Sequence, residues 1–211
     1  MARRLSRIVV IVLALGLVAG AGQPSQGQKD KQKQGKDPQS EYEPRSDPGA
    51  GQEFLKKFVG DWEVEKSFFG RGGGAPSKSK GECQQTMVHG GRFLKSEFTF
   101  GQGAAQSTGT GTIGFDAQTG QFTSYWIDSR STRISVRQSK DKFDGQKIVL
   151  FAVSLGQTGG AESARSRTIT TLEDNGRKIV HRQATLNSDG TERPVMELLM
   201  TRKTAAAPPG Q

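Results

Sequence analysis

A tryptophan and an aspartate stand two residues apart near the middle of the chain, at Trp126 and Asp128, and Phe122 precedes them in the same phase. Alternate residues of an extended strand share one face, so these side chains would form one wall. If that wall faces the inside of a barrel, the rings would contact an apolar ligand and the carboxylate would anchor a polar group on it. The alternative is that Asp128 ends the strand and caps the turn at residues 129–131.

Two further polar side chains are candidates for the same site. Arg92 would donate a bidentate pair to Asp128 or remain solvated, and His181 lies in the middle of an expected strand. An enzyme that used Asp128 with Arg92 or His181 would need an Asp128 with a raised pKa in a cleft. His89, the other histidine, does not share metal-ligand spacing with His181, and no Ser–His–Asp order is recognisable. We therefore predict no metal site and assign no catalytic residue.

The composition excludes several classes of protein. A single Cys and two His among 211 residues exclude a disulfide framework and a cysteine-rich zinc or iron–sulfur site. A hydrophobic fraction of 32% excludes a polytopic membrane protein. We expect Cys83 to be a small buried hydrophobic residue rather than a reactive thiol.

The first 21 residues have the pattern of a secretory signal peptide. Arg3, Arg4 and Arg7 precede an apolar run at residues 8–18, and small residues follow at 19–21. The alternative, a membrane anchor, needs about 20 apolar residues, so we expect cleavage and no stable membrane span afterwards. The chain is then exported by the Sec route to the periplasm or the exterior of a bacterium.

Loss of those three arginines would lower the formal net charge from +9 to +6. The remaining basic excess is diffuse and follows no nucleic-acid-binding motif, so we expect no nucleic-acid partner. Residues 22–50 form a polar spacer and residues 204–211 a short tail, and both are expected to be disordered because they contain too little apolar surface to fold. A folded domain of residues 51–203 remains.

Period-two alternation fills this domain after one short helix at residues 52–58. Turn residues punctuate the alternation every eight to twelve positions. The expected strands begin with Trp62, Val64 and Phe68 on one face and continue at 79–88, 92–100, 107–115, 121–128, 131–138, 146–153, 164–173, 177–186 and 192–202.

Nine or ten sequential strands with short turns predict an all-β, up-and-down antiparallel barrel, because closure removes unpaired sheet edges. A two-sheet sandwich is the alternative, and the helix would cap one end of the barrel. In a closed meander the last strand pairs with the first, so Arg202 would stack on the Trp62 indole and close the barrel.

The opening Gly60-x-Trp62 with the late Arg202 resembles the lipocalin and calycin barrels. Further motifs follow in order at residues 90–94, 109–116 and 125–129 and at Thr132. Together they resemble the bacterial family called domain of unknown function 1579, in which Tyr usually stands at the position of Phe115. The resemblance implies a lipocalin-like barrel and no established activity.

Some calycin relatives hold haem through one His, but those nitrobindin-like proteins open with Gly-x-Trp-x-Gly, which this chain lacks, so we expect no cofactor. Gly109, Gly111 and Gly114 indicate strand bends or a close approach of backbone to another group, and not a dinucleotide loop, since no helix follows them.

The sequence thus favours a secreted barrel that binds a small hydrophobic or amphipathic ligand. Two alternatives stay open. One is a hydrolase- or isomerase-type enzyme built on Asp128. The other is an envelope structural or interaction protein tethered by its spacer.

Overall fold

The computed structural model describes residues 38–43, 45–153 and 166–204. The chain divides into two units, Met1–Pro44 and Arg45–Gln211. In the first, residues 38–43 form a turn in which the amides of Tyr42 and Glu43 donate to the carbonyl of Gln39. The predicted signal peptide and most of the predicted spacer and tail lie outside the described residues.

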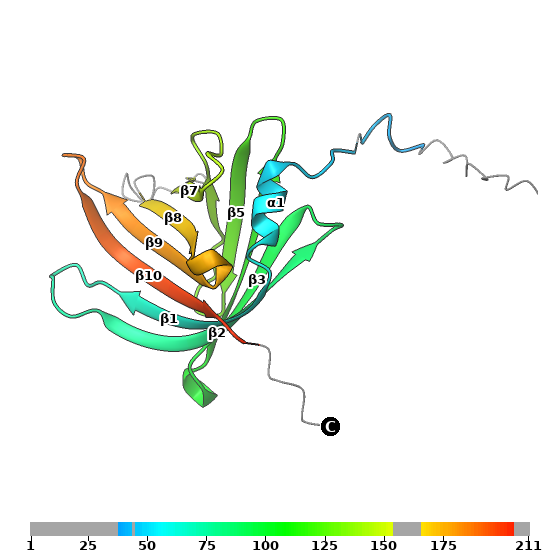
Figure 1. Ribbon diagram of the computed structural model, residues 1–211. Coiled ribbons are helices and arrows are strands. Elements are labelled where there is room, and N and C mark those ends of the chain that lie inside the picture. Colours follow the sequence, from blue (N-terminus) through cyan, green and yellow to red (C-terminus); the bar gives the residue numbers. More distant parts are fainter. Residues whose placement is uncertain (1–37, 44, 154–165, 205–211) are drawn as a thin grey trace, which may run out of the picture. The chain divides into compact units, whose positions relative to one another are not determined.

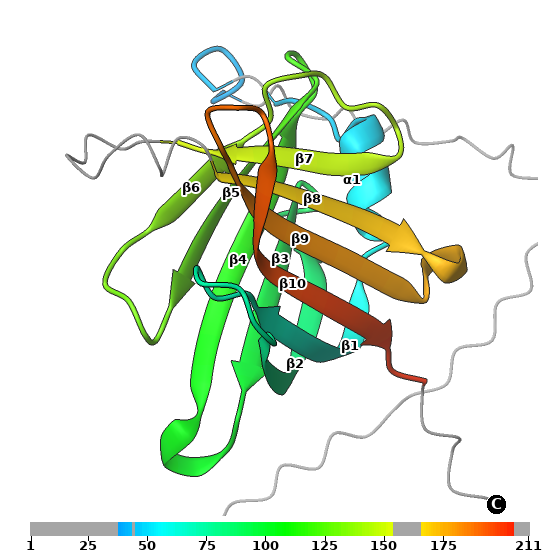
Figure 2. The ribbon, with the colours of Figure 1, turned by 90° about the vertical axis from the view of Figure 1, so that its left-hand side faces the viewer.

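The second unit is a closed antiparallel barrel, drawn from two sides in Figures 1 and 2. Ten strands in the described residues follow one another around it, and β1 pairs with β10 to complete the circle. The elements are α1 (Ala50–Lys56), β1 (Gly60–Phe68), β2 (Ser77–Val88), β3 (Phe93–Phe100), β4 (Ser107–Asp116), β5 (Gln121–Asp128), β6 (Ser135–Gln138), β7 (Lys147–Ala152), β8 (Ser166–Glu173), β9 (Lys178–Leu186) and β10 (Glu192–Arg202), with short 3₁₀ turns at Gly103–Ala105 and Asp174–Gly176. The predicted meander barrel is confirmed, and its closure excludes the two-sheet sandwich.

Turn chemistry sets the strand ends, as the β4–β5 hairpin illustrates. The carboxylate of Asp116 accepts hydrogen bonds from the Gln118 amide and the Thr119 hydroxyl. Gly120 then adopts a φ of +73°, which favours glycine. The turn fixes the register, so that Asp116 pairs with Gln121 and every later pair of the hairpin follows.

Most strands lie within two residues of their predicted bounds, and the differences at the helix and at β6 have a clear physical cause. The helix α1 begins at Ala50 rather than at 52, because the Gln52 side chain accepts from the Gly49 amide and donates to the Phe115 carbonyl. These two bonds hold the first turn on the barrel. The strand predicted at 131–138 begins only at Ser135, because residues 129–134 form a loop around the end of β5.

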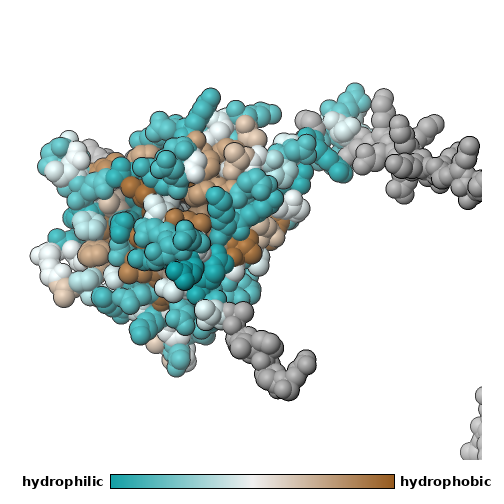
Figure 3. Space-filling view, in the orientation of Figure 1, coloured by the Kyte–Doolittle hydropathy of each residue, from teal (hydrophilic) through white to brown (hydrophobic). Residues whose placement is uncertain are grey.

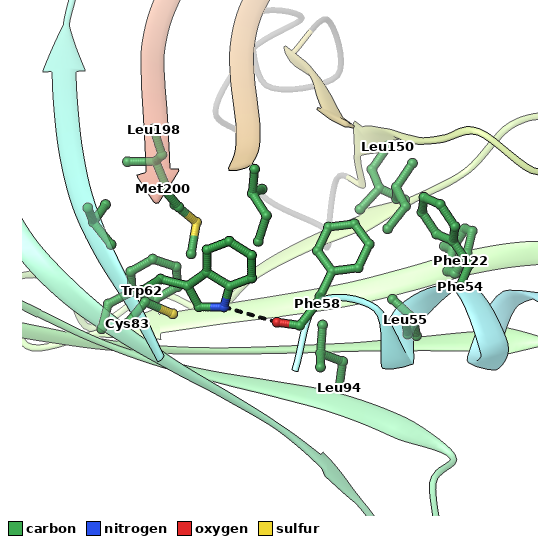
Figure 4. Close-up of a cluster of buried hydrophobic side chains, with 14 of the residues drawn as sticks. Phe54, Leu55, Phe58, Trp62, Cys83, Leu94, Phe122, Leu150, Leu198 and Met200 are labelled. Atoms are coloured by element: carbon green, nitrogen blue, oxygen red, sulfur yellow. Dashed lines mark hydrogen bonds between the residues drawn. The ribbon is translucent and has the colours of Figure 1, made fainter. Parts of the chain in front are cut away.

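Figure 4 shows the buried cluster that closes one end of the barrel, where β1 begins and β10 ends. Leu55 and Phe58 come from the helical segment, and Trp62 and Met200 come from the two closing strands. Cys83 lies in the same cluster, as predicted for a buried cysteine, and burial raises the pKa of its thiol to about 12. The thiol is therefore protonated at neutral pH.

The outer face of the barrel in Figure 3 is largely hydrophilic, with hydrophobic side chains visible between the polar ones. Within the described part of the chain, every helix is too short or too polar to cross a lipid bilayer.

Candidate functional site

A cavity of about 850 Å³ lies inside the barrel. Leu55 and Phe58 form its floor at the end covered by α1. Its rim at the opposite end includes Phe68, Ser107 and Ser131, which stand at strand ends or in the loop after β5. The cavity therefore opens at the end of the barrel that faces away from the helix.

Most of the wall is apolar. Inward-facing positions of β3, β7, β9 and β10 contribute aliphatic and aromatic side chains, in keeping with the alternation of each strand. These residues are Leu94, Phe98, Phe100, Ile148, Leu150, Ile179, Met196, Leu198 and Met200. Small residues of β3, β4 and β5 leave the space between the walls unfilled, among them Ser96, Gly109, Gly111 and Ser124.

Trp126 and Asp128 both line this cavity, as the alternation of β5 predicts. The indole Nε1 donates a 2.7 Å hydrogen bond to Asp128 Oδ2, and the ring meets Phe98 edge-on with centroids 5.5 Å apart. The other carboxylate oxygen, Oδ1, accepts from the Arg130 amide at 2.8 Å. Asp128 thus lines the cavity, holds the indole and caps the turn. The predicted cap is present, and the anchoring of a ligand by Asp128 stays a prediction.

The electrostatics of Asp128 do not suit a general acid. Although burial acts to raise its pKa, the hydrogen bonds from Trp126 and from the Arg130 and Ser131 amides hold that pKa below its usual value. An ionised carboxylate at neutral pH is the result. Asp128 therefore does not have the raised pKa that the enzyme hypothesis requires, and that prediction is wrong.

Two glycines of β4 make room for the indole. A Cβ on Gly109 would collide with the six-membered ring of Trp126, and one on Gly111 would press on its edge. Register places Gly111 opposite Trp126 and Gly109 opposite Asp128. Of the two explanations considered for the glycine series, close approach of backbone to a ring is the one that the structure supports at these positions.

The opposite wall carries a polar cluster centred on His181. Its Nδ1 lies 2.8 Å from the Thr170 hydroxyl oxygen, and burial, followed by the charge of nearby Arg137, lowers the His181 pKa to about 4. Ser166 accepts hydrogen bonds from Gln183 Nε2 at 3.3 Å and from Arg137 Nη1 at 3.2 Å. His181 is thus a neutral member of a hydrogen-bonded group rather than an acid at pH 7.

A second charged group lies at the rim. The Lys66 ammonium stands 3.6 Å from the centroid of the Phe100 ring. Burial and then the charge of Arg130 lower the Lys66 pKa, while Asp128 acts to raise it. The charges of Arg130 and Asp128 therefore both act on Lys66 at the mouth of the cavity.

Two predicted site residues lie elsewhere. Phe122 is 1% exposed and packs with Phe115 and Phe143 toward the helical end, so it supports the barrel without lining the cavity. Arg92 stands in the β2–β3 turn, where its guanidinium donates to the carbonyls of His89 and Ser46. The pairing expected between Arg92 and Asp128 is wrong, because the two residues lie toward opposite ends of the barrel.

Register gives the reason for this separation. The neighbour of Arg92, Phe93, pairs with Gly114, whereas Asp128 pairs with Gly109. Five residues along β4 span about 17 Å, which no arginine side chain bridges.

Trp62 and Arg202 meet as the strand pairing predicts. They are register partners of β1 and β10, and the guanidinium lies 4.2 Å from the indole ring. Its nitrogens donate to the carbonyls of Lys57, Val59 and Gly176, while the indole Nε1 donates to the Phe58 carbonyl at 3.0 Å (Figure 4). The pair joins both ends of the sheet to the helix and to the β8–β9 turn.

The sequence analysis missed Arg137 and Lys66 as cavity residues. Lys66 follows Trp62 and Val64 in the inward phase of β1, and this phase was the signal for it. Arg137 lies on the four-residue strand β6, which has too few apolar side chains to reveal its phase. Among the described residues, no group of three or more His, Cys, Asp or Glu is arranged to hold a metal ion.

Comparison with known proteins shows the family of the chain. A search of curated proteins found no match. Among solved structures, the chain is similar to the crystal structure of Rv2717c from M. tuberculosis, with 15% identity and a TM-score of 0.47 over 75% of this chain and 100% of that one. The profile of the family described as "Protein of unknown function (DUF1579)" matches residues 47–202, which include the whole barrel, and the chain belongs to this family.

Proposed function

We propose that the protein is a binding protein that holds a small hydrophobic or amphipathic ligand inside the barrel. The cavity of about 850 Å³ carries this proposal. Pockets for small molecules have volumes of about 300–1,000 Å³, with apolar walls and a few convergent polar groups. A barrel of about eight strands is just wide enough for side chains to fill or for one small ligand, and ten strands enclose more space.

A lipophilic fluorescent dye tests this proposal when it is titrated into the purified protein. Ser124→Phe places a ring in the cavity, and Thr123→Phe, one residue away and exposed, is its matched control on the outer face. We expect saturable binding that weakens about tenfold or more in Ser124→Phe and stays unchanged in Thr123→Phe. Equal binding to all three proteins would place the dye on the exterior and contradict the proposal.

We also propose that the protein acts outside the cytoplasm after removal of residues 1–21. The basic residues, apolar run and small residues of the N-terminus support this. Expression of the full chain in a bacterium, followed by N-terminal sequencing of the exported protein, would test it. We expect the mature chain to begin at or near residue 22, and Leu15→Arg, which interrupts the apolar run, to block processing. An unprocessed chain in the cytoplasm would contradict the proposal.

A further inference from the structure

Arg137 lines the cavity wall and has no carboxylate partner among the residues that the structure describes. Arg137 lines the cavity from β6, opposite Ser124 and one inward position below the Trp126 level. Its one side-chain hydrogen bond within the described part of the chain runs to the Ser166 hydroxyl, and no ion pair there involves it. Burial lowers its pKa, and no carboxylate counteracts that effect.

A guanidinium without a counter-ion destabilises the fold unless a ligand supplies the missing negative charge. A guanidinium carries five N–H donors, and removing an ion from water without a counter-ion costs several kcal/mol. The neighbours are neutral groups, namely the Ser166 hydroxyl, the Gln183 amide and the uncharged His181 ring. Most of the donors of Arg137 are therefore available to a ligand in the cavity.

The charged side chains that line the cavity are mostly positive, as Arg137 is. Of the described residues that line it, Lys66, Arg130 and Arg137 are basic and Asp128 alone is acidic. Asp128 already accepts hydrogen bonds from Trp126 and from the Arg130 amide. Asp128 is therefore already paired at the rim, and the other charged side chains described in the lining are basic.

The shape of an arginine fork selects among anions. Two parallel N–H groups match the two oxygens of a carboxylate. Beyond the polar neighbours of Arg137, the cavity wall includes the apolar side chains of Leu150, Leu198 and Met200. A small hydrophilic anion would leave those walls in contact with water. A molecule with one carboxylate and a long apolar chain would satisfy both the guanidinium and the walls.

We propose that Arg137 binds the carboxylate of an amphipathic monocarboxylate, such as a fatty acid, whose chain lies along the apolar wall of the cavity. This inference rests on the proposed binding function, and it adds the class of ligand and the residue that selects it. Ser166 orients the guanidinium by accepting its hydrogen bond, and Gln183 in turn holds the Ser166 hydroxyl.

Displacement of the dye by matched lipids tests the inference near pH 7. Hexadecanoate and hexadecan-1-ol have chains of the same length and differ in the charged group. We expect hexadecanoate to bind about tenfold or more tightly than hexadecan-1-ol. Arg137→Met should remove this preference by weakening hexadecanoate alone, and Arg133→Met, which changes an exposed arginine in the loop before β6, should keep it.

The outcomes separate the two proposals. If both lipids displace the dye equally, or if Arg137→Met keeps the preference, the inference is wrong while the binding function stands. If neither lipid nor dye binds the wild type, the binding function itself is wrong. Folding is checked by thermal unfolding, and Arg137→Met should be at least as stable as the wild type because it removes a partly buried charge. A second variant, Arg137→Lys, keeps the charge without the fork and should bind hexadecanoate with intermediate affinity.

Discussion

The six-membered ring of Trp126 occupies the space beside Gly109, on the neighbouring strand, where any other residue would carry its Cβ. This contact holds the indole against the cavity wall, and the hydrogen bond to Asp128 fixes its orientation. The aromatic side of the site therefore depends on the absence of a side chain on β4.

Gly109→Ala should push the indole off β4 and destabilise the protein by about 1–3 kcal/mol, the usual cost of overpacking. Urea unfolding measures the loss, and the tryptophan emission spectrum reports the displaced ring. Gly72→Ala is the control, because a Cβ there meets nothing within 4 Å. Equal stability of Gly109→Ala and the wild type would show that the close contact is not as described.

Arg202→Lys should destabilise the barrel by about 2–4 kcal/mol. A lysine keeps the charge over Trp62 but cannot donate to the three carbonyls that the guanidinium reaches together. Chemical unfolding measures the change. The matched substitution is Arg182→Lys on the exposed face of β9, which should change stability by less than about 1 kcal/mol. A similar effect of the two substitutions would rule out a special role for Arg202.

His181 should make stability depend on pH between about 6.5 and 4. Its folded-state pKa of about 4 lies below the ordinary 6.5, so the unfolded chain binds more protons in this window. The stability contributed by the neutral ring is complete above pH 6.5 and falls, by at most about 3 kcal/mol, as the pH drops toward 4.

The measurement is the difference in unfolding free energy between the wild type and His181→Gln across that window, because the carboxylates titrate equally in both proteins. Arg137 is the charged group that faces the ring and lowers its pKa further. A difference that stays constant with pH would contradict the buried neutral histidine.

Cys83 should resist thiol reagents in the folded protein. It is 2% exposed, and burial raises its pKa to about 12, so almost no thiolate is present near pH 8. A colorimetric thiol assay should detect no reaction in the native state and one reactive thiol per chain in denaturant. Rapid reaction of the native protein would show that this part of the core opens readily.

The barrel itself was predictable from local patterns. Period-two alternation located the strands, and consecutive hairpins implied that β1 pairs with β10, which places Arg202 beside Trp62. The pairing of Gly111 with Trp126 also follows from the two-strand register set by the turn at Asp116–Gly120. The pairing of Gly111 with Trp126 could therefore have been predicted from the sequence.

Position along the barrel axis was harder to predict. Alternation tells which way a side chain points and not how deep it lies, so Phe122 and Trp126 share a face while only Trp126 lines the cavity. The same limit led to the wrong pairing of Arg92 with Asp128. The inward position of Arg137 was not predicted, because a strand of four residues is too short to show which of its faces is apolar.

Quenching of tryptophan fluorescence by a brominated fatty acid tests the binding cavity most directly. The chain has two tryptophans, of which Trp126 lines the cavity and Trp62 is fully buried at the closed end. We predict saturable quenching in the wild type, and little quenching in Trp126→Phe, where only Trp62 emits. No saturable quenching in the wild type, or equal fractional quenching in both proteins, would contradict a ligand held inside the barrel.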